Sequence, residues 1–208
     1  MARLNPKFWD KIANKYAKTP VEDQPAYEKK LKITRQYMGP TMVVAEFGCG
    51  TGSTSIAHAP FVQHIYASDL SENMLAIARQ KAVEQNITNV TFSHSTIEQY
   101  QQNHSSLDMV MTHSLLHLLK DKEQAIKRIF NMLKPGGIFV SSTTCITDQW
   151  MPKLFLPIGN FLGLLPLVNF FSPQHLLDTI NNAGFEIEQS FQSANEGAIF
   201  IVAKKPTD

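Results

Sequence analysis

A short apolar run that breaks into alternating glycines most constrains the fold of this chain. Residues 43–47 are apolar except for Glu46, and Gly48, Gly50 and Gly52 follow at every second position. Glycine lets the backbone turn sharply after a buried strand and approach a ligand closely, and the helix that follows offers free N–H groups to that ligand. The pattern predicts a strand, a ligand-binding loop and a helix, and it favours a cofactor that contains adenosine.

Glu46, two residues before the first glycine, restricts the charge of that cofactor. A pyrophosphate would lie beside this carboxylate, whereas a cationic ligand would be attracted to it. A dinucleotide fingerprint also needs a glycine three residues after Gly50, and Ser53 stands there. An enzyme with a cationic adenosyl cofactor is therefore favoured, and a noncatalytic or redox module that binds a nicotinamide dinucleotide is the alternative.

The glycine segment resembles the first motif of the class I S-adenosylmethionine-dependent methyltransferases. Later segments resemble further motifs of that family in the same order: Ala67–Ser71, Leu107–His117, Leu133–Val140 and Ala183–Ile187. The resemblance runs from about Trp9 to Ala203, and within the family it points to the ubiquinone and menaquinone methyltransferase branch. It implies S-adenosylmethionine as cofactor and methyl transfer to a small acceptor. The uncharged segment 154–171 suggests a lipophilic acceptor, and the absence of the acids found in metal-dependent members favours a metal-independent enzyme.

The same resemblance implies an α/β fold, a Rossmann-like three-layer αβα sandwich. Its seven-stranded, mostly parallel sheet would have the order 3-2-1-4-5-7-6 with strand 7 antiparallel, and apolar periodicity agrees with alternating strands and helices. The expected strands are 43–47, 65–68, 90–92, 108–112, 138–142, 185–188 and 198–203. The expected helices are 6–18, 22–37, one around Ile56, one capped by Ser71, one that starts at Asp121 and ends before 134–137, and 173–183.

The chain length of 208 residues suits one such sandwich. We expect a single methyltransferase domain over 1–208, with 1–38 as an N-terminal helical cap and 150–172 as an apolar helical insertion after strand 5. Residues 154–171 carry no charged side chain. They are long enough to span a membrane, but strands 6 and 7 lie downstream and must return to the sheet. Three interpretations stay open for this segment: a wall of the acceptor site, a homodimer surface, or a peripheral membrane contact.

Charge and cysteine content limit the kinds of partner and the cellular location that we expect for this protein. The 19 basic and 18 acidic residues are balanced, which argues against a nucleic-acid partner. Cys49 and Cys145 form no CxxC pair, and the first ten residues hold no apolar stretch that resembles a signal peptide. We expect a cytoplasmic protein with a small-molecule methyl acceptor.

Ligands of such sheets bind beyond the carboxyl ends of the strands, where the strand order reverses. The resemblance places Glu46 near the cationic end of the cofactor, Asp69 at the ribose, and Leu70 and Met74 against the adenine. Tyr16 lies in a segment similar to the family's opening segment, which folds over the cofactor. The remaining candidates for cofactor contacts are Gly48, Cys49, Gly50, Gly52, Thr96, Ile97 and Thr112.

His113 is the candidate catalytic residue, because it follows strand 4 and would border both cofactor and acceptor. Transfer from a sulfonium releases a neutral thioether, so a base is useful only for a neutral hydroxyl or amine acceptor. A structural loop histidine, an acceptor contact and a metal ligand paired with His117 are the open alternatives. No acid lies alongside that pair, and Thr143 and Thr144 occupy the place of the acids in metal-dependent family members, so no metal site is expected.

Overall fold

The computed structural model describes residues 6–100, 105–145, 168–192 and 197–207. At its centre lies a sheet with the strand order β3-β2-β1-β4-β5-β7-β6. The first five strands run parallel, and β7 is antiparallel to both of its neighbours. The strands are β1 Val43–Phe47, β2 His64–Asp69, β3 Val90–His94, β4 Leu107–His113, β5 Leu133–Thr144, β6 Glu186–Gln192 and β7 Ala198–Lys204. The predicted fold class and strand order are confirmed.

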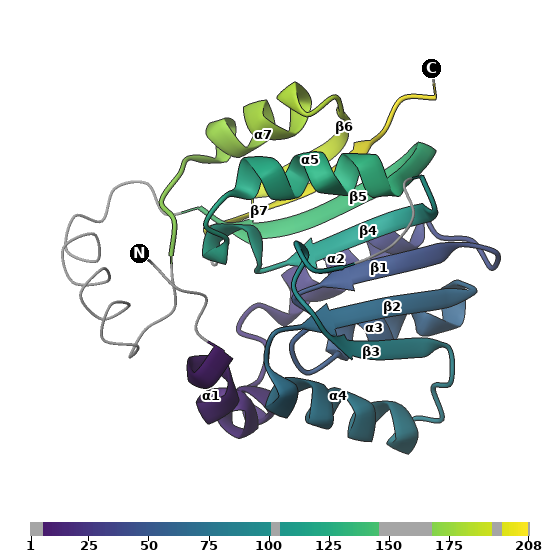
Figure 1. The fold of residues 1–208 in the computed structure, drawn as a ribbon, viewed down its shortest axis with the longest axis vertical. Helices are drawn as coiled ribbons and strands as arrows, with labels where there is room; N and C mark the ends of the chain where they lie inside the picture. The colour runs from purple at the N-terminus through teal and green to yellow at the C-terminus, as the bar shows by residue number, and fades with distance from the viewer. Residues whose placement is uncertain (1–5, 101–104, 146–167, 193–196, 208) are drawn as a thin grey trace.

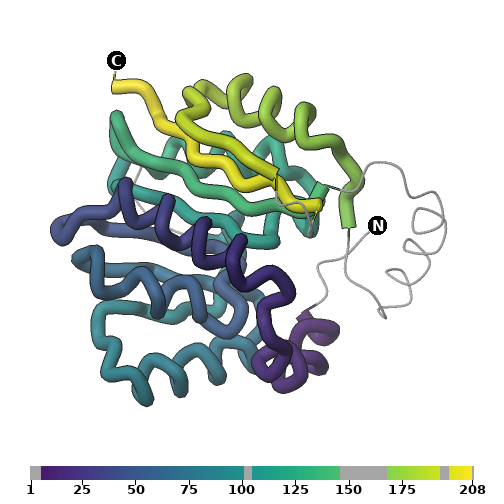
Figure 2. Tube along the Cα trace, turned by 180° about the vertical axis from the view of Figure 1, so that it is seen from behind, coloured from purple at the N-terminus to yellow at the C-terminus, as the bar shows by residue number. Residues whose placement is uncertain are grey.

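Helices cover both faces of this sheet. They are α1 Pro6–Lys18, α2 Gln24–Arg35, α3 Ser53–His58, α4 Glu72–Glu84, α5 Lys122–Met132 and α7 Pro173–Asn182, with short 3₁₀ turns η1 Ala59–Phe61 and η2 Leu116–Leu118. Helices α5 and α7 lie on one face (Figure 1), and α2 and α3 cross the other (Figure 2). Each face has its own buried cluster, because successive strand residues point to opposite sides. Phe47 and Val110 belong to one cluster, and Val44 and Met109 to the other.

Two predicted helix starts are confirmed by their caps. The Ser71 hydroxyl accepts the N–H of Met74 at 3.2 Å, and the Asp121 carboxylate accepts the N–H of Gln124 at 2.8 Å. Each side chain satisfies an N–H group that has no partner within its own helix. Both helix starts are therefore determined by local hydrogen bonds of the capping side chains.

Several element boundaries differ from the prediction, and α2 and β5 show the physical reasons. Helix α2 is shorter than 22–37, because the Asp23 carboxylate accepts the N–H of Ala26 at 3.0 Å and starts the helix there. Strand β5 begins at Leu133, where the end of a helix and a turn were expected. Leu133 pairs with Leu107, and the register then shifts before Met109 pairs with Ile138. The glycine-rich segment 134–137 thus lies within β5, at an irregularity of its pairing with β4.

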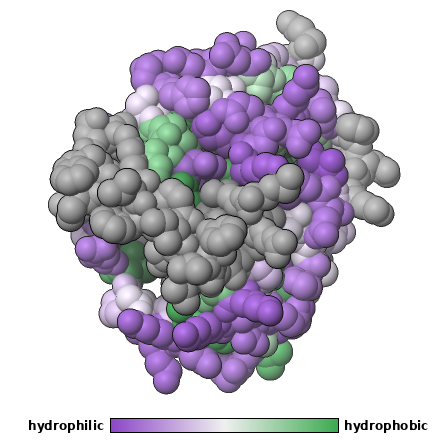
Figure 3. Space-filling model, turned by 60° about the vertical axis from the view of Figure 1, so that its left-hand side comes forward, coloured by the Kyte–Doolittle hydropathy of each residue, from purple (hydrophilic) through white to green (hydrophobic). Residues whose placement is uncertain are grey.

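Figure 3 brings forward the side of the molecule toward which the parallel strands run. Hydrophilic residues cover most of the described surface in that view, and apolar ones reach it in small areas. Residues 150–167 of the expected insertion lie outside the described residues. Its described end is anchored: the N–H of Asn169 donates to the His117 carbonyl at 2.7 Å, and Phe171 is buried. None of the helices in the described ranges combines the length and apolarity needed to cross a bilayer.

Candidate functional site

Two adjoining cavities lie at the carboxyl ends of the parallel strands. Their volumes are about 270 Å³ and about 610 Å³. They share residues of the glycine loop and of the ends of β4 and β5, together with one residue of α1. The shared residues are Tyr16, Gly48, Gly50, His113, Ser114 and Thr144. The glycine loop therefore divides one continuous site into two parts.

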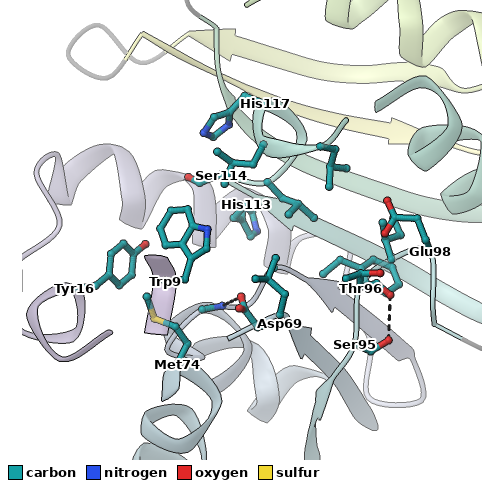
Figure 4. Close-up of a pocket in the computed structure, with 18 of the residues that line it drawn as sticks. Trp9, Tyr16, Asp69, Met74, Ser95, Thr96, Glu98, His113, Ser114 and His117 are labelled. Atoms are coloured by element: carbon teal, nitrogen blue, oxygen red, sulfur yellow. Dashed lines mark hydrogen bonds between the residues drawn. The ribbon is translucent and has the colours of Figure 1, made fainter. Parts of the chain in front are cut away.

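Helix α1 is tied to the start of α4, which brings it over the first cavity. The Asp10 carboxylate accepts the Ser71 hydroxyl at 2.6 Å and the N–H of Asn73 at 3.2 Å. Trp9 and Tyr16 of the same helix line the first cavity. In Figure 4 they stand on one side of it, with Thr96 and Glu98 on the other. The predicted placement of Tyr16 at the cofactor site thus has a structural basis in the Asp10 anchor.

Asp69 at the end of β2 links the first cavity to the glycine loop. One carboxylate oxygen accepts the N–H of Gly50 at 2.8 Å, and the other accepts the N–H of Ser71 at 2.9 Å. Burial raises the pKa of Asp69, and these two hydrogen bonds oppose that shift. A carboxylate has about four acceptor positions, so Asp69 can also accept a hydroxyl group from a ligand in the cavity.

The rest of the first cavity has the character of a purine pocket. Leu70, Met74, Thr96 and Ile97 line it, and their role as cofactor contacts stays a prediction from the sequence. Further residues that were not predicted as cofactor contacts also line it: Trp9, Phe47, Ser95, Glu98, Ser114, Leu115, His117, Leu118, Leu119 and Thr144. Apolar side chains with a few polar groups at the rim suit an adenine ring.

Glu46 lies in the second cavity, together with Cys49. Its side chain is 1% exposed, and it accepts a hydrogen bond from the Ser55 hydroxyl of α3. Burial raises the pKa of Glu46 to about 7, and the Ser55 hydrogen bond opposes the shift. A cationic ligand would favour the ionised form, so its binding would release a proton near neutral pH. Cys49 is a neutral thiol, because burial raises its pKa well above the usual value.

Two of the predicted cofactor residues line neither cavity. Gly52 caps α3 with a φ of +73°, and a Cβ there would lie 2.8 Å from the Ala78 Cβ. Its lack of a side chain allows α4 to pack against the loop. Thr112 is fully buried and lies next to His113 on β4, so its side chain points to the opposite face of the sheet. Their assignment as cofactor contacts stays a prediction.

Three histidines surround the site as neutral rings. Burial lowers the pKa of His58 to about 3 and that of His113 and His117 to about 4. The charge of Lys30 contributes to the shift at His113. Within the described chain, both ring nitrogens of His58 and the Nε2 atom of His113 have no hydrogen-bond partner. His58 and His113 line the second cavity, but these nitrogen atoms are themselves buried.

His113→Ala is expected to lower the rate of methyl transfer and to leave the affinity for S-adenosylhomocysteine nearly unchanged, since the ring lies where the two cavities meet. With a pKa of about 4, His113 is already neutral at physiological pH, so its titration should add no break to the wild-type pH–rate profile between about pH 5 and pH 8. His64→Ala, at the opposite end of β2, is the control. Full activity of the His113 variant would reduce this residue to a structural role.

Comparison with known proteins agrees with this geometry. Residues 44–137 match the family model described as a methyltransferase domain. The chain is 34% identical over 115 residues to phosphoethanolamine N-methyltransferase 2 of Caenorhabditis elegans, a match that covers 53% of this chain and 26% of that relative. It is 24% identical over 165 residues to the ubiquinone biosynthesis O-methyltransferase of Ruegeria pomeroyi, covering 77% of this chain and 65% of the relative. The chain thus spans less than two thirds of the length of either curated relative.

A solved structure shares the fold. It is that of phosphoethanolamine N-methyltransferase 2 from Haemonchus contortus in complex with S-adenosyl-L-methionine. The TM-score is 0.70 at 17% identity, and the match covers 86% of this chain and 53% of that chain. The chain is thus similar to methyltransferase domains over residues 44–137, a range that includes the glycine loop, Glu46 and Asp69 of the paired cavities.

Proposed function

We propose that this chain is an enzyme that transfers the methyl group of S-adenosylmethionine to a small-molecule acceptor without a metal ion. The observation that carries the proposal is the placement of two carboxylates on either side of the glycine loop, the half-buried Asp69 in the first cavity and the buried Glu46 in the second. A ligand that is a ribonucleoside at one end and a cation at the other matches this pair.

In the proposed complex the adenosine occupies the first cavity, with its ribose hydroxyls on Asp69 and its adenine between Leu70, Met74 and Ile97. The methionine part crosses the glycine loop toward Glu46. The transferable methyl group then lies near His113, Ser114 and Thr144, which border both cavities. Because the leaving group is a neutral thioether, alignment and exclusion of water supply most of the rate. Among the described residues, no group of three or more His, Cys, Asp or Glu side chains could hold a metal ion.

We further propose a lipophilic methyl acceptor of the quinone type. A lipophilic acceptor is supported by the uncharged composition of residues 154–171 and by the described end of that segment, which is anchored to the His117 carbonyl beside the first cavity. One relative, the Ruegeria pomeroyi protein, supports the quinone-type branch. A single domain over 1–208, the cap role of residues 1–38, a homodimer and a peripheral membrane contact stay proposals from the sequence.

Asp69→Ala should weaken binding of S-adenosylhomocysteine by about 1.5–3 kcal/mol, because it removes a charged acceptor from the ribose hydroxyls. Calorimetric titration measures this loss. The substitution also removes the bonds to Gly50 and Ser71, so the thermal midpoint is measured in parallel to show that the variant is folded. Asp178→Ala, on α7 and remote from both cavities, is the control.

The same titration separates the two function classes that the sequence left open. Wild-type protein should bind S-adenosylmethionine and S-adenosylhomocysteine and show no binding of NADH. Tight NADH binding without a response to S-adenosylhomocysteine would overturn the proposed function.

A further inference from the structure

A cluster of hydrogen-bond donors lies on the glycine loop, at the wall of the second cavity. The ammonium group of Lys81, on α4, donates to the hydroxyl oxygens of Thr51 at 3.1 Å and Ser53 at 3.2 Å. All three residues line the second cavity. Lys81 is half-buried, Thr51 is 5% exposed and Ser53 is exposed. The cluster is therefore open to a ligand in that cavity.

This cluster has donors that no protein acceptor uses. An ammonium group has three N–H bonds, and the two hydroxyls take two of those of Lys81. Because the hydroxyls of Thr51 and Ser53 accept from Lys81, their own O–H bonds can donate elsewhere, and within the described chain neither of them does. One N–H group and two O–H groups are thus available to an oxyanion in the second cavity.

The protein balances the charge of Lys81 only in part. Burial lowers the pKa of Lys81, and the charge of Glu84, on the next turn of α4, opposes that shift. Glu84 is exposed and accepts a hydrogen bond from Gln80, so solvent screens its attraction to Lys81. A carboxylate that accepted the third N–H bond of Lys81 would add a charge-assisted hydrogen bond that no described residue supplies.

In the proposed function the methionine part of the cofactor brings two opposite charges into this cavity, an ammonium and a carboxylate on the same carbon atom. Glu46 accepts the Ser55 hydroxyl, and Lys81 donates to the Ser53 hydroxyl. The negative and the positive group are therefore both held by α3, through side chains two positions apart. This arrangement matches the two charges of an amino acid.

The other charged residues that line the second cavity in the described part of the chain are Glu22 and Lys30. Glu22 is exposed and has the same charge as the carboxylate of the cofactor. Lys30 lies on α2, and its charge acts on His113 at the end of β4. Lys81 is thus the positive group that contacts the glycine loop itself.

We propose, on the basis of the proposed function, that Lys81, Thr51 and Ser53 bind the carboxylate of the methionine part, while Glu46 binds its ammonium group. The site then requires an intact amino acid in the cofactor and selects against a decarboxylated one. The part of the cavity that is lined by α2 and His113 stays available to the methyl acceptor.

The test titrates the full chain with S-adenosylhomocysteine and with its decarboxylated analogue, which keeps the adenosine, the thioether and the ammonium group. Wild-type protein should bind S-adenosylhomocysteine at least about tenfold more tightly, because the analogue lacks the acceptor of the charge-assisted hydrogen bonds. Lys81→Met should weaken binding of S-adenosylhomocysteine and leave binding of the analogue nearly unchanged, so that the preference is lost. Lys81→Arg should keep the preference. Lys32→Met, an exposed position on α2, is the control.

Three outcomes would overturn the proposal. The first is equal binding of the two ligands by the wild-type protein. The second is an equal loss of affinity for both ligands in Lys81→Met, which would make Lys81 a structural link between α4 and the loop. The third is an unchanged preference in Lys81→Met together with its loss in Lys30→Met, which would assign the carboxylate to α2. If wild-type protein binds neither ligand, the proposed function itself fails, which is a result distinct from these three.

Discussion

Glu46→Gln is expected to raise the free energy of unfolding of the ligand-free protein at pH 8 by about 3 kcal/mol. The pKa of Glu46 is about 7 in the folded protein and 4.5 as a model value. The folded state therefore binds this proton more tightly than the unfolded chain, and the wild-type protein loses stability as the pH rises from 4.5 to about 7. Gln carries no charge, and its side-chain carbonyl can still accept the Ser55 hydroxyl. Its advantage should grow over this interval and level off above it.

The same substitution should weaken S-adenosylmethionine binding by about 10- to 100-fold, because it removes the negative charge that faces the cationic end of the ligand. Wild-type affinity should rise with pH through about 7, whereas the affinity of the variant should not depend on pH in this interval. Denaturant unfolding and calorimetry from pH 5 to pH 8 measure both effects. Glu84→Gln, on the exposed side of α4, should change neither. A Glu46 variant that is less stable than wild type at pH 8 would show that the carboxylate is a structural group.

The ionised Glu46 lowers the stability of the ligand-free protein and favours the binding of a cationic ligand. The ligand-free protein bears the cost of an ionised Glu46 in a nearly solvent-free position, and a cationic ligand removes that cost when it binds. Asp69 has a different role, since its hydrogen bonds to Gly50 and Ser71 shape the loop before any ligand arrives. One carboxylate thus orders the site, and the other favours a positively charged ligand.

The sheet was predictable from sequence because its signals are local. The apolar run 43–47 matches β1 residue by residue, and Ser71 and Asp121 mark helix starts through side-chain caps. The start of β5 was not predictable. The segment 134–137 has the composition of a turn, and it joins the strand only because Leu133 pairs with Leu107, a contact between distant parts of the chain.

Some residues of the candidate site were predictable from local sequence signals, and others were not. Residues at strand ends, such as Glu46, Asp69 and His113, could be placed because parallel strands end at one edge of the sheet. Lys30 and His58 could not. An amphipathic pattern tells which side of a helix is buried, but the partner of that side depends on how the helix packs. His58 reaches the second cavity from α3 and Lys30 from α2, and neither position carries a local signal.

The three loop glycines looked equivalent in sequence, but in the structure substitution of Gly52 should mainly lower stability and substitution of Gly50 should mainly lower cofactor affinity. At Gly52 a Cβ would lie 2.8 Å from the Ala78 Cβ and 3.0 Å from the Phe92 ring, in a backbone conformation with a φ of +73°. Gly52→Ala should therefore destabilise the protein by about 2–5 kcal/mol, the sum of backbone strain and overpacking.

Gly50→Ala is the matched substitution at the cavity itself. A Cβ at Gly50 would meet only the Tyr16 ring, at 4.0 Å. The loss of stability should therefore be limited to the backbone strain of a non-glycine residue at a φ of +52°, which is about 1–2 kcal/mol. The methyl group would occupy space assigned to the cofactor, and S-adenosylhomocysteine affinity should fall. Thermal unfolding and calorimetry on both variants should thus give a folded protein that binds poorly for Gly50→Ala and an unstable protein for Gly52→Ala. In the Gly52 variant, any molecules that remain folded should bind nearly normally, because Gly52 lines neither cavity. Normal affinity in Gly50→Ala would mean that the cofactor does not cross the loop where the two cavities meet.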